Sequence, residues 1–363
     1  MVAALFPAMA DTIVSQLDAL YVSLTVLTLL HAASKRGLWA GSAVVACHIA
    51  HAALLEHMSL FLGGTHCHAT SPLLPMVSPC SSINSLLFYV PWTYTSIEAA
   101  RRLDLRPAAF PFAVGLLQIG FGAVYEMQGP TNGYWNWPDE GGVIANSPEL
   151  KPWDGYPPVL HEAKRQREVA TIVDGVFRVS HHAGVALAER VFQIPVLAMY
   201  YHFAYGFGWA MGLLLTGHVD SLGHPSPPRL FVAGLLSLVL FLPPIWATQA
   251  LSEAAGLPLV QGVPFSLAVS VLPVAIFGRA AGSTAAAAPS PAGPDGLLFL
   301  ISLGMQAFFL TLPWRTSRST PQALVALVAV TAALHLAAQS YCCFGVHSRA
   351  GAPRRGERQK KAL

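Results

Sequence analysis

The combination best suited to catalysis in this sequence is a carboxylate followed by a group of aromatic residues. Glu126 stands at the end of a long apolar segment, and the turn GPTNGYWNWP that follows it carries Tyr134, Trp135 and Trp137. A carboxyl group at a hydrocarbon boundary is poorly solvated, so its pKa rises and it can hold a proton near neutral pH, as a general acid must. Indole faces stabilise developing positive charge. The pattern predicts acid catalysis by Glu126, with the three aromatic residues binding the ligand.

The same pattern also has a purely structural explanation. Tyr and Trp are enriched at membrane interfaces whatever a protein does. Glu126 can also cap a helix or pair with Arg178 or Arg190. The residue types alone leave both explanations open.

A second candidate group is the histidine-rich segment HIAHAALLEHMSLF. On a helix His48 and His51 lie about 60° apart and share a face, and Glu56 lies about 80° from His48. Imidazole and carboxylate groups are good metal ligands, but the spacing matches neither HExxH nor the HxxxH and HxxHH boxes of membrane di-iron oxygenases. We therefore predict no metal and no other cofactor, and regard these three residues as ligand-binding candidates. Histidines that only hydrogen-bond to neighbouring helices are the alternative.

His202 is the remaining catalytic candidate, because an ionisable residue inside an apolar span is costly and is by default functional. It lies in the aromatic segment QIPVLAMYYHFAYGFGW. His335 is expected to be packed and hydrogen-bonded, and Glu98, which lies beside Arg101 and Arg102, to pair locally. If their side of the membrane is oxidising, Cys67 and Cys80 could form a disulfide.

Composition places these candidates in a membrane protein. The chain has 363 residues, of which 54% are hydrophobic and 11% charged, and its mean hydropathy is +0.51. Soluble domains carry about 25% charged residues, so this chain has too few charges to cover a water-facing surface. Its formal net charge of +3 suggests no nucleic-acid partner, and the expected partner is membrane lipid.

Apolar runs near the length that crosses about 30 Å of hydrocarbon predict an all-α, polytopic transmembrane helical bundle of about nine spans. This membrane domain covers residues 1–346, and residues 347–363 form a basic tail. The predicted spans are Thr12–Ala33, Leu38–Leu62, Ser82–Ala100, Ala108–Met127, Val191–Thr216, Leu230–Leu251, Leu257–Gly278, Gly296–Trp314 and Ala323–Cys343.

The distribution of lysine and arginine predicts the orientation. The short loops carry most of these residues on one side if the N-terminus is extracytosolic and the C-terminus cytosolic, as the positive-inside rule requires. The long loop 128–190 is then extracytosolic. Its second half, Val159–Arg190, has helical periodicity, so we expect an amphipathic helix on the membrane surface or packed on the bundle.

Three segments resemble an uncharacterised family of eukaryotic multi-pass membrane proteins, a domain of unknown function, over roughly residues 40–215. They are FYVPWTYTSIEAARRLDL, GAVYEMQGPTNGYWNWPDEGGVI and FQIPVLAMYYHFAYGFGWA. The order of acid, glycine, aromatic pair and Ile-Pro is also similar to bacterial membrane carotenoid hydratases, which protonate an isoprenoid double bond and add water. That resemblance implies a proton donor at Glu126, cation-stabilising indoles at Trp135 and Trp137, and an isoprenoid or other lipid ligand. This chain departs from the pattern by inserting residues 145–190.

Three functions are compatible with these residues. The first is an integral membrane enzyme that acts on a lipid or isoprenoid by acid catalysis from Glu126. The second is a transporter or channel for an ion or small molecule that uses His48, His51 and His202. The third is a non-catalytic scaffold whose polar loop is a docking face.

Overall fold

A computed structural model describes most of the predicted spans and little of the long loop. The described residues are 13–63, 67–68, 71, 73–78, 81–103, 105–132, 135–136, 187–217, 227–256, 259–277, 295–315 and 322–345. The predicted helix at Val159–Arg190 lies outside them, except for its last four residues. Tyr134, Trp137 and Cys80 also lie outside the described residues.

Helices dominate the described part of the chain and make up 89% of it. The long ones are α2 (Ile13–Arg36), α3 (Leu38–Gly63), α4 (Ile83–Arg101), α5 (Phe110–Asn132), α8 (Leu187–Leu215), α9 (Pro227–Leu240), α10 (Leu242–Ala254), α11 (Leu259–Phe277), α12 (Gly296–Arg315) and α13 (Gln322–Ser340). A 3₁₀ turn, η1 (Pro107–Ala109), precedes α5, and a π-helical turn, η3 (Tyr341–Gly345), follows α13. The chain is thus the helical protein that its composition predicts.

Four described stretches are long and apolar enough to cross a membrane: Val14–Arg36, Leu38–His57, Pro227–Thr248 and Val325–Phe344. Shorter apolar helices occupy Pro107–Gly122, Leu267–Ile276 and Gly296–Thr311. These stretches support an integral membrane protein. The total of nine spans and the orientation of the termini stay predictions.

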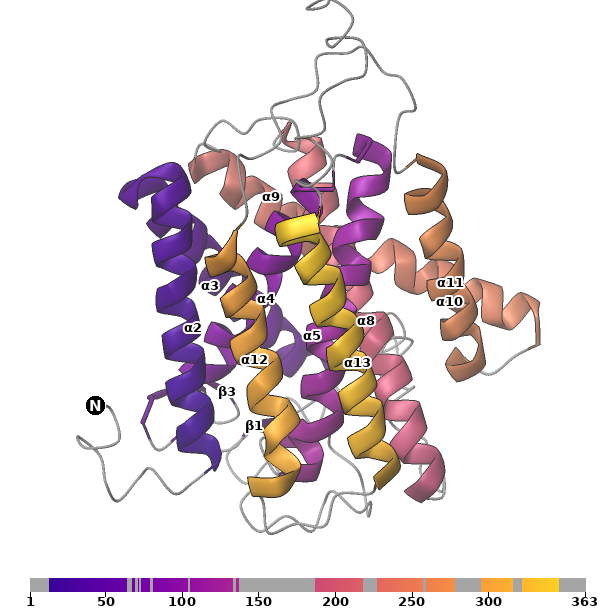
Figure 1. The fold of residues 1–363 in the computed structure, drawn as a ribbon. Coiled ribbons are helices and arrows are strands. Elements are labelled where there is room, and N and C mark those ends of the chain that lie inside the picture. The colour runs from indigo at the N-terminus through magenta and orange to yellow at the C-terminus, as the bar shows by residue number, and fades with distance from the viewer. Residues whose placement is uncertain are drawn as a thin grey trace, which may run out of the picture.

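Small residues allow the helices at the centre of the bundle to approach closely. α5 packs along α8, and α8 packs along α9 (Figure 1). Gly208 and Gly212, four residues apart on α8, face the backbone of α9 near Ser237 and Ala233. In membranes such small-residue stripes allow backbones to approach, so that dispersion contacts can hold the helices together.

Two differences between the predicted spans and the structure involve proline, one at a helix start and one where a helix continues past it. The predicted single span Leu230–Leu251 is divided at Phe241, where α9 gives way to α10. Pro243 and Pro244 open α10, and a proline is well placed in the first turn of a helix but not in its interior. The turn predicted directly after Glu126 is wrong: α5 continues through Pro130 to Asn132.

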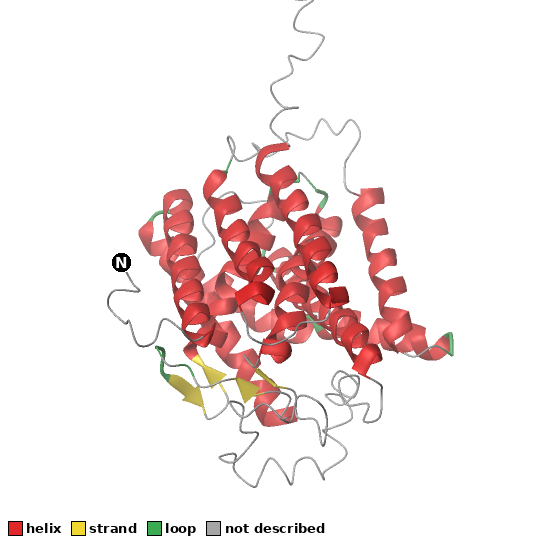
Figure 2. Cartoon of the chain, turned by 60° about the horizontal axis from the view of Figure 1, so that its bottom comes forward, coloured by secondary structure: helices red, strands yellow, loops and turns green. Residues whose placement is uncertain are grey.

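Short strands gather at one end of the bundle, which we call the strand end (Figure 2). β1 (Cys67–His68) pairs antiparallel with β4 (Trp135–Asn136), so that His68 stands opposite Trp135. β2 (Met76–Ser78) pairs antiparallel with β3 (Ser81–Ser82). This pairing ties the segment after α5 to the connection between α3 and α4.

The opposite end, where α2 and α4 finish with Arg36 and Arg101, we call the basic end. α3 starts beside it and runs toward the strand end (Figure 1). Side chains on α3 can therefore connect the two ends of the molecule.

Candidate functional site

A line of buried polar side chains extends along α3 and its neighbours. His48, His51 and Glu56 are only 3%, 4% and 3% exposed, so all three point into the bundle. Groups of this kind are expensive to bury in a membrane unless they have partners. Their partners come from α4, α8 and α9.

His51 has a hydrogen-bond partner at each ring nitrogen. Its Nδ1 lies 2.8 Å from the hydroxyl of Tyr205 on α8, and its Nε2 lies 2.6 Å from the hydroxyl of Ser237 on α9. Ser237 donates its own proton to the carbonyl of Gly234 at 2.7 Å. A neutral imidazole has one N–H donor and one acceptor, so Nε2–H donates to Ser237 and Nδ1 accepts from Tyr205.

Glu56 carries the line to the strand end. The hydroxyl of Tyr89 on α4 donates to one carboxylate oxygen at 2.5 Å, and Nε2 of His68 on β1 lies 3.5 Å from the other. The Tyr89 and Tyr205 rings are 5.3 Å apart between centroids. Glu56 also acts electrostatically on Tyr205, so the Glu56 and His51 groups adjoin one another.

His48 carries the line to the basic end. It lies one helical turn before His51, and both imidazoles lie against the indole of Trp209, with centroids 4.7 and 4.6 Å away. Among the described residues, Nδ1 of His48 has no hydrogen-bond partner. A buried imidazole nitrogen in that condition needs a water molecule or another ligand.

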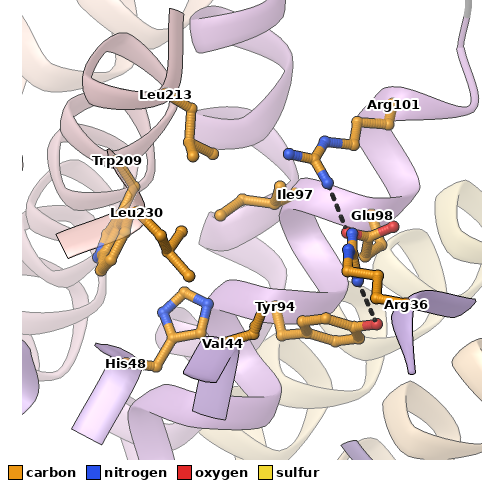
Figure 3. A pocket seen from close by; sticks show the side chains of 10 residues that line it. All are labelled: Arg36, Val44, His48, Tyr94, Ile97, Glu98, Arg101, Trp209, Leu213 and Leu230. Carbon is orange, nitrogen blue, oxygen red and sulfur yellow. Dashed lines mark hydrogen bonds and ion pairs between the residues drawn. The ribbon is translucent and has the colours of Figure 1, made fainter. Parts of the chain in front are cut away.

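A small cavity supplies room for such a molecule (Figure 3). Its volume is about 20 Å³, enough for roughly one water molecule. Its lining combines charged and apolar side chains: Arg36, Val44, His48, Tyr94, Ile97, Glu98, Arg101, Trp209, Leu213 and Leu230. Because several of these groups can hydrogen-bond, a water molecule here would have the partners it needs.

Glu98 sits between two arginines at this cavity. It accepts from Arg101 at 2.8 Å and also from Arg36, whose other amino group donates to the Tyr94 hydroxyl at 3.2 Å. The predicted local pairing of Glu98 is confirmed by its contact with Arg101. Arg102 donates instead to Asp295.

His202 lies beside the line and is 2% exposed. Its ring meets the edge of Trp92 with centroids 4.3 Å apart, and Trp92 in turn stacks on Tyr205 at 5.2 Å. The structure thus brings His202 and the α3 histidines around one group of aromatic rings, although they are far apart in sequence.

The proposed Glu126 site is only partly described. The backbone of Glu126 lies within α5, and Trp135 lies in β4 at the strand end. Its side-chain arrangement with Tyr134, Trp135 and Trp137 falls outside the described residues. Acid catalysis by Glu126 therefore stays a prediction from the sequence.

Metal ligands do not converge in the described part of the chain: no three His, Cys, Asp or Glu side chains there could hold an ion together. Sequence reasoning missed several partners of the buried line, namely Tyr89, Ser237, Tyr94, His31 and Asp295. Tyr and Ser within apolar runs resemble ordinary packing residues, and Asp295 follows a low-complexity segment. Only a search for every ionisable group at a span boundary would have found Asp295.

The sequence matches no protein-family model and no curated protein, and no solved structure matches this fold. The two resemblances described from sequence motifs therefore stay predictions. What the chain does must be inferred from its own side chains.

Proposed function

We propose that this chain is an integral membrane protein that transfers protons across the bilayer through its interior. The observation that carries the proposal is the pair of hydrogen-bonded groups His51–Tyr205 and Tyr89–Glu56, which adjoin one another inside the bundle. Imidazole, phenol and carboxyl groups can each accept a proton on one side and release one on the other. Of the functions compatible with the sequence, transport through buried histidines is the one this arrangement favours.

The buried polar groups continue beyond α3 toward both ends of the bundle. From His48 to Glu56 the helix rises about 12 Å at 1.5 Å per residue, whereas the hydrocarbon core of a bilayer is about 30 Å thick. The cavity and Glu98 extend the groups toward the basic end, and His68 extends them beyond Glu56 toward the strand end.

Direct hydrogen bonds cover two steps of this path, and the other steps need mobile bridges. The cavity beside His48 has room for roughly one water molecule, which would connect His48 to Glu98 and Tyr94. Rotation of a ring or a further water would complete the steps from His48 to His51 and from Tyr205 to Tyr89. Water-mediated hydrogen bonds are nearly as favourable as direct ones, so a proton could pass along these steps as well.

Reconstitution into liposomes tests the proposal. Vesicles hold a pH-sensitive dye, and a potassium gradient with valinomycin sets the membrane potential. Wild-type protein is expected to carry a proton flux well above that of empty vesicles. Tyr205→Phe removes only the hydroxyl that donates to His51, and it should lower the flux at least tenfold.

Tyr341→Phe is the matched control, because Tyr341 is 44% exposed in η3 and belongs to none of the groups described above. It should conduct as the wild type does. A wild-type flux no greater than that of empty vesicles would overturn the proposal. So would a Tyr205→Phe variant that conducts normally.

A further inference from the structure

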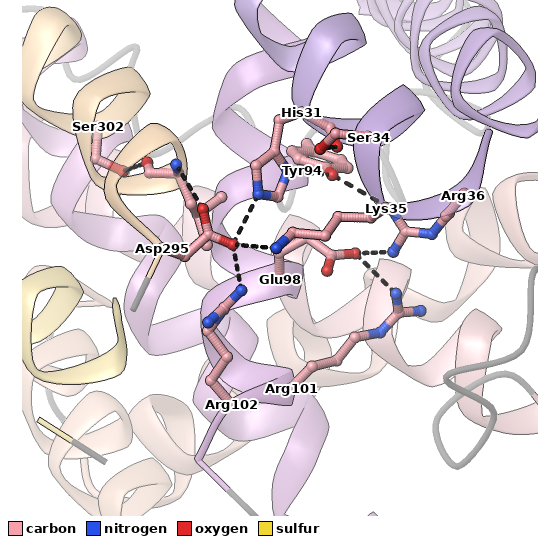
Figure 4. A network of polar contacts seen from close by, with 11 residues as sticks. His31, Ser34, Lys35, Arg36, Tyr94, Glu98, Arg101, Arg102, Asp295 and Ser302 are labelled. Atoms are coloured by element: carbon pink, nitrogen blue, oxygen red, sulfur yellow. Dashed lines mark hydrogen bonds and ion pairs between the residues drawn. The ribbon is translucent and has the colours of Figure 1, made fainter. Parts of the chain in front are cut away.

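Asp295 is the centre of a second polar network, at the basic end (Figure 4). It immediately precedes α12 and is 4% exposed. One carboxylate oxygen lies 2.9 Å from Nε2 of His31 and 3.1 Å from Nζ of Lys35, and it also accepts from Arg102. Three segments of the chain, namely α2, the end of α4 and the start of α12, therefore meet at this oxygen atom.

The position of this carboxylate is held by the backbone as well. Its other oxygen accepts from the Leu298 amide at 3.2 Å, as an N-terminal cap of α12 does. The Asp295 amide donates to the carbonyl of Cys343 at 3.2 Å, which attaches it to the end of α13. Asp295 is therefore fixed by contacts that do not depend on His31.

His31 connects Asp295 to the cavity beside His48. Its Nδ1 lies 2.6 Å from the Tyr94 hydroxyl, and Tyr94 is one of the side chains that line the cavity. The Tyr94 oxygen already accepts from Arg36, so its own proton points to Nδ1 of His31. His31 then carries its proton on Nε2 and donates it to Asp295.

We propose that Asp295, His31 and Tyr94 form the port through which protons pass between the basic end and the interior of this protein. The inference rests on the proton-transfer function proposed above. In one passage the Tyr94 hydroxyl gives its proton to Nδ1 of His31 while Nε2–H passes to the Asp295 carboxylate. Tyr94 regains a proton from the cavity, and the new carboxylic acid releases its proton to water. His31 now carries its proton on Nδ1, and a rotation of the imidazole ring by about 180° returns that proton to the Asp295 side before the next passage. The same steps in reverse take a proton in.

Asp295 is itself buried, but it lies next to a side chain that reaches solvent. The Lys35 side chain that contacts it is 40% exposed, so the carboxylate lies at the edge of the bundle. Burial by itself would raise the pKa of Asp295, but its interactions with His31, the Leu298 amide and the charge of Arg102 hold it well below its ordinary value. The group is therefore ionised at neutral pH, and a proton that reaches it is released again readily.

A purely structural role, in which the Asp295–His31 contact only holds the helices together, makes different predictions. Free imidazole, which is not covalently attached to the chain, cannot replace a side chain that links two helices. It can replace a side chain that only accepts and releases a proton at that position. Chemical rescue of a His31 variant by imidazole therefore separates the two roles.

The experiment uses the liposome assay with wild-type protein, His31→Gln, His31→Ala and Ser34→Ala. Ser34 is the control, since within the described part of the chain its hydroxyl bonds only the backbone carbonyl of His31, at 2.7 Å. We expect His31→Gln and His31→Ala to lower the flux at least tenfold, imidazole to restore much of it in His31→Ala, and Ser34→Ala to conduct normally. His31→Gln keeps a side chain of similar size and serves if His31→Ala does not fold.

Three results would overturn the inference in distinguishable ways. If the wild type carries no flux, the proposed function itself fails. If the wild type conducts and His31→Gln conducts equally, the function stands and the port fails. If the His31 variants lose flux together with their thermal stability and imidazole restores nothing in a folded variant, His31 is structural.

Discussion

Gly122 of α5 lies against the imidazole of His202 on α8, so closely that a Cβ atom at position 122 would overlap the ring. Gly120, two residues earlier and so on nearly the opposite side of α5, faces His335 of α13 in the same manner. α5 therefore has room for two buried histidines because it has a glycine opposite each ring. His202 can lie beside Trp92 only because residue 122 has no side chain.

Gly122→Ala should consequently destabilise the protein. The extra methyl group must displace either the His202 ring or the helix, and overpacking of this kind costs about 1–3 kcal/mol. We expect a lower melting temperature in detergent. Gly296→Ala is the control, because a Cβ there meets no atom within 4 Å. Equal melting temperatures for the two variants would contradict the predicted clash.

Asp18 should be essential to the strand end. It is fully buried and accepts from Ser71 at 2.6 Å, Asn84 at 2.5 Å and the Leu73 amide at 3.3 Å. Asp18→Asn turns one acceptor into a donor that faces donors, and an unsatisfied buried group costs about 1–3 kcal/mol. Thermal unfolding should show a larger loss for Asp18→Asn than for Ser71→Ala, which removes one donor only. The opposite order would show that the Ser71 contact dominates.

Glu56→Gln should stop proton transfer without unfolding the protein. Glutamine keeps the acceptor for Tyr89 but cannot take up and release a proton, so the liposome flux is expected to fall at least tenfold. Glu253→Gln on α10 makes the same chemical change at an exposed position and should have no effect. Equal fluxes from these two variants would remove Glu56 from the path.

Asp295 should make the stability of the protein depend on pH in the acidic range. Its pKa is lower in the folded protein than in the unfolded chain, where an aspartate titrates near about 3.9. Its contribution is therefore complete above that pH and is lost as the pH falls toward the folded-state pKa. The wild-type melting temperature should drop more steeply below about pH 4 than that of Asp295→Asn. Parallel curves would show that Asp295 is not responsible.

Glu126→Gln tests the acid-catalysis prediction separately. If Glu126 protonates a lipid or isoprenoid, the variant should fold normally but lose turnover. Mass spectrometry of lipids that copurify in mild detergent is the measurement, and a retained polyene would also be visible by its absorbance. Identical copurified lipids and products from wild type and variant would contradict this role.

Periodicity and composition were sufficient for the properties that depend on neighbouring residues. Few charges and long apolar runs predicted a helical membrane protein, and about 100° per residue put His48 and His51 on one face. The pairing of Glu98 with Arg101, three residues away on α4, follows from the same helical geometry. These predictions hold because a helix brings residues three or four apart together whatever surrounds it.

The partners of those residues were determined by tertiary packing. His51 meets Tyr205 across 154 positions of sequence, and His31 meets Asp295 across 264. Such pairs depend on the depth and rotation at which each helix docks, and these depend on small residues such as Gly122 that carry no polar signal of their own. Local spacing can show that a histidine points inward, but only the packed helices specify which group receives its proton.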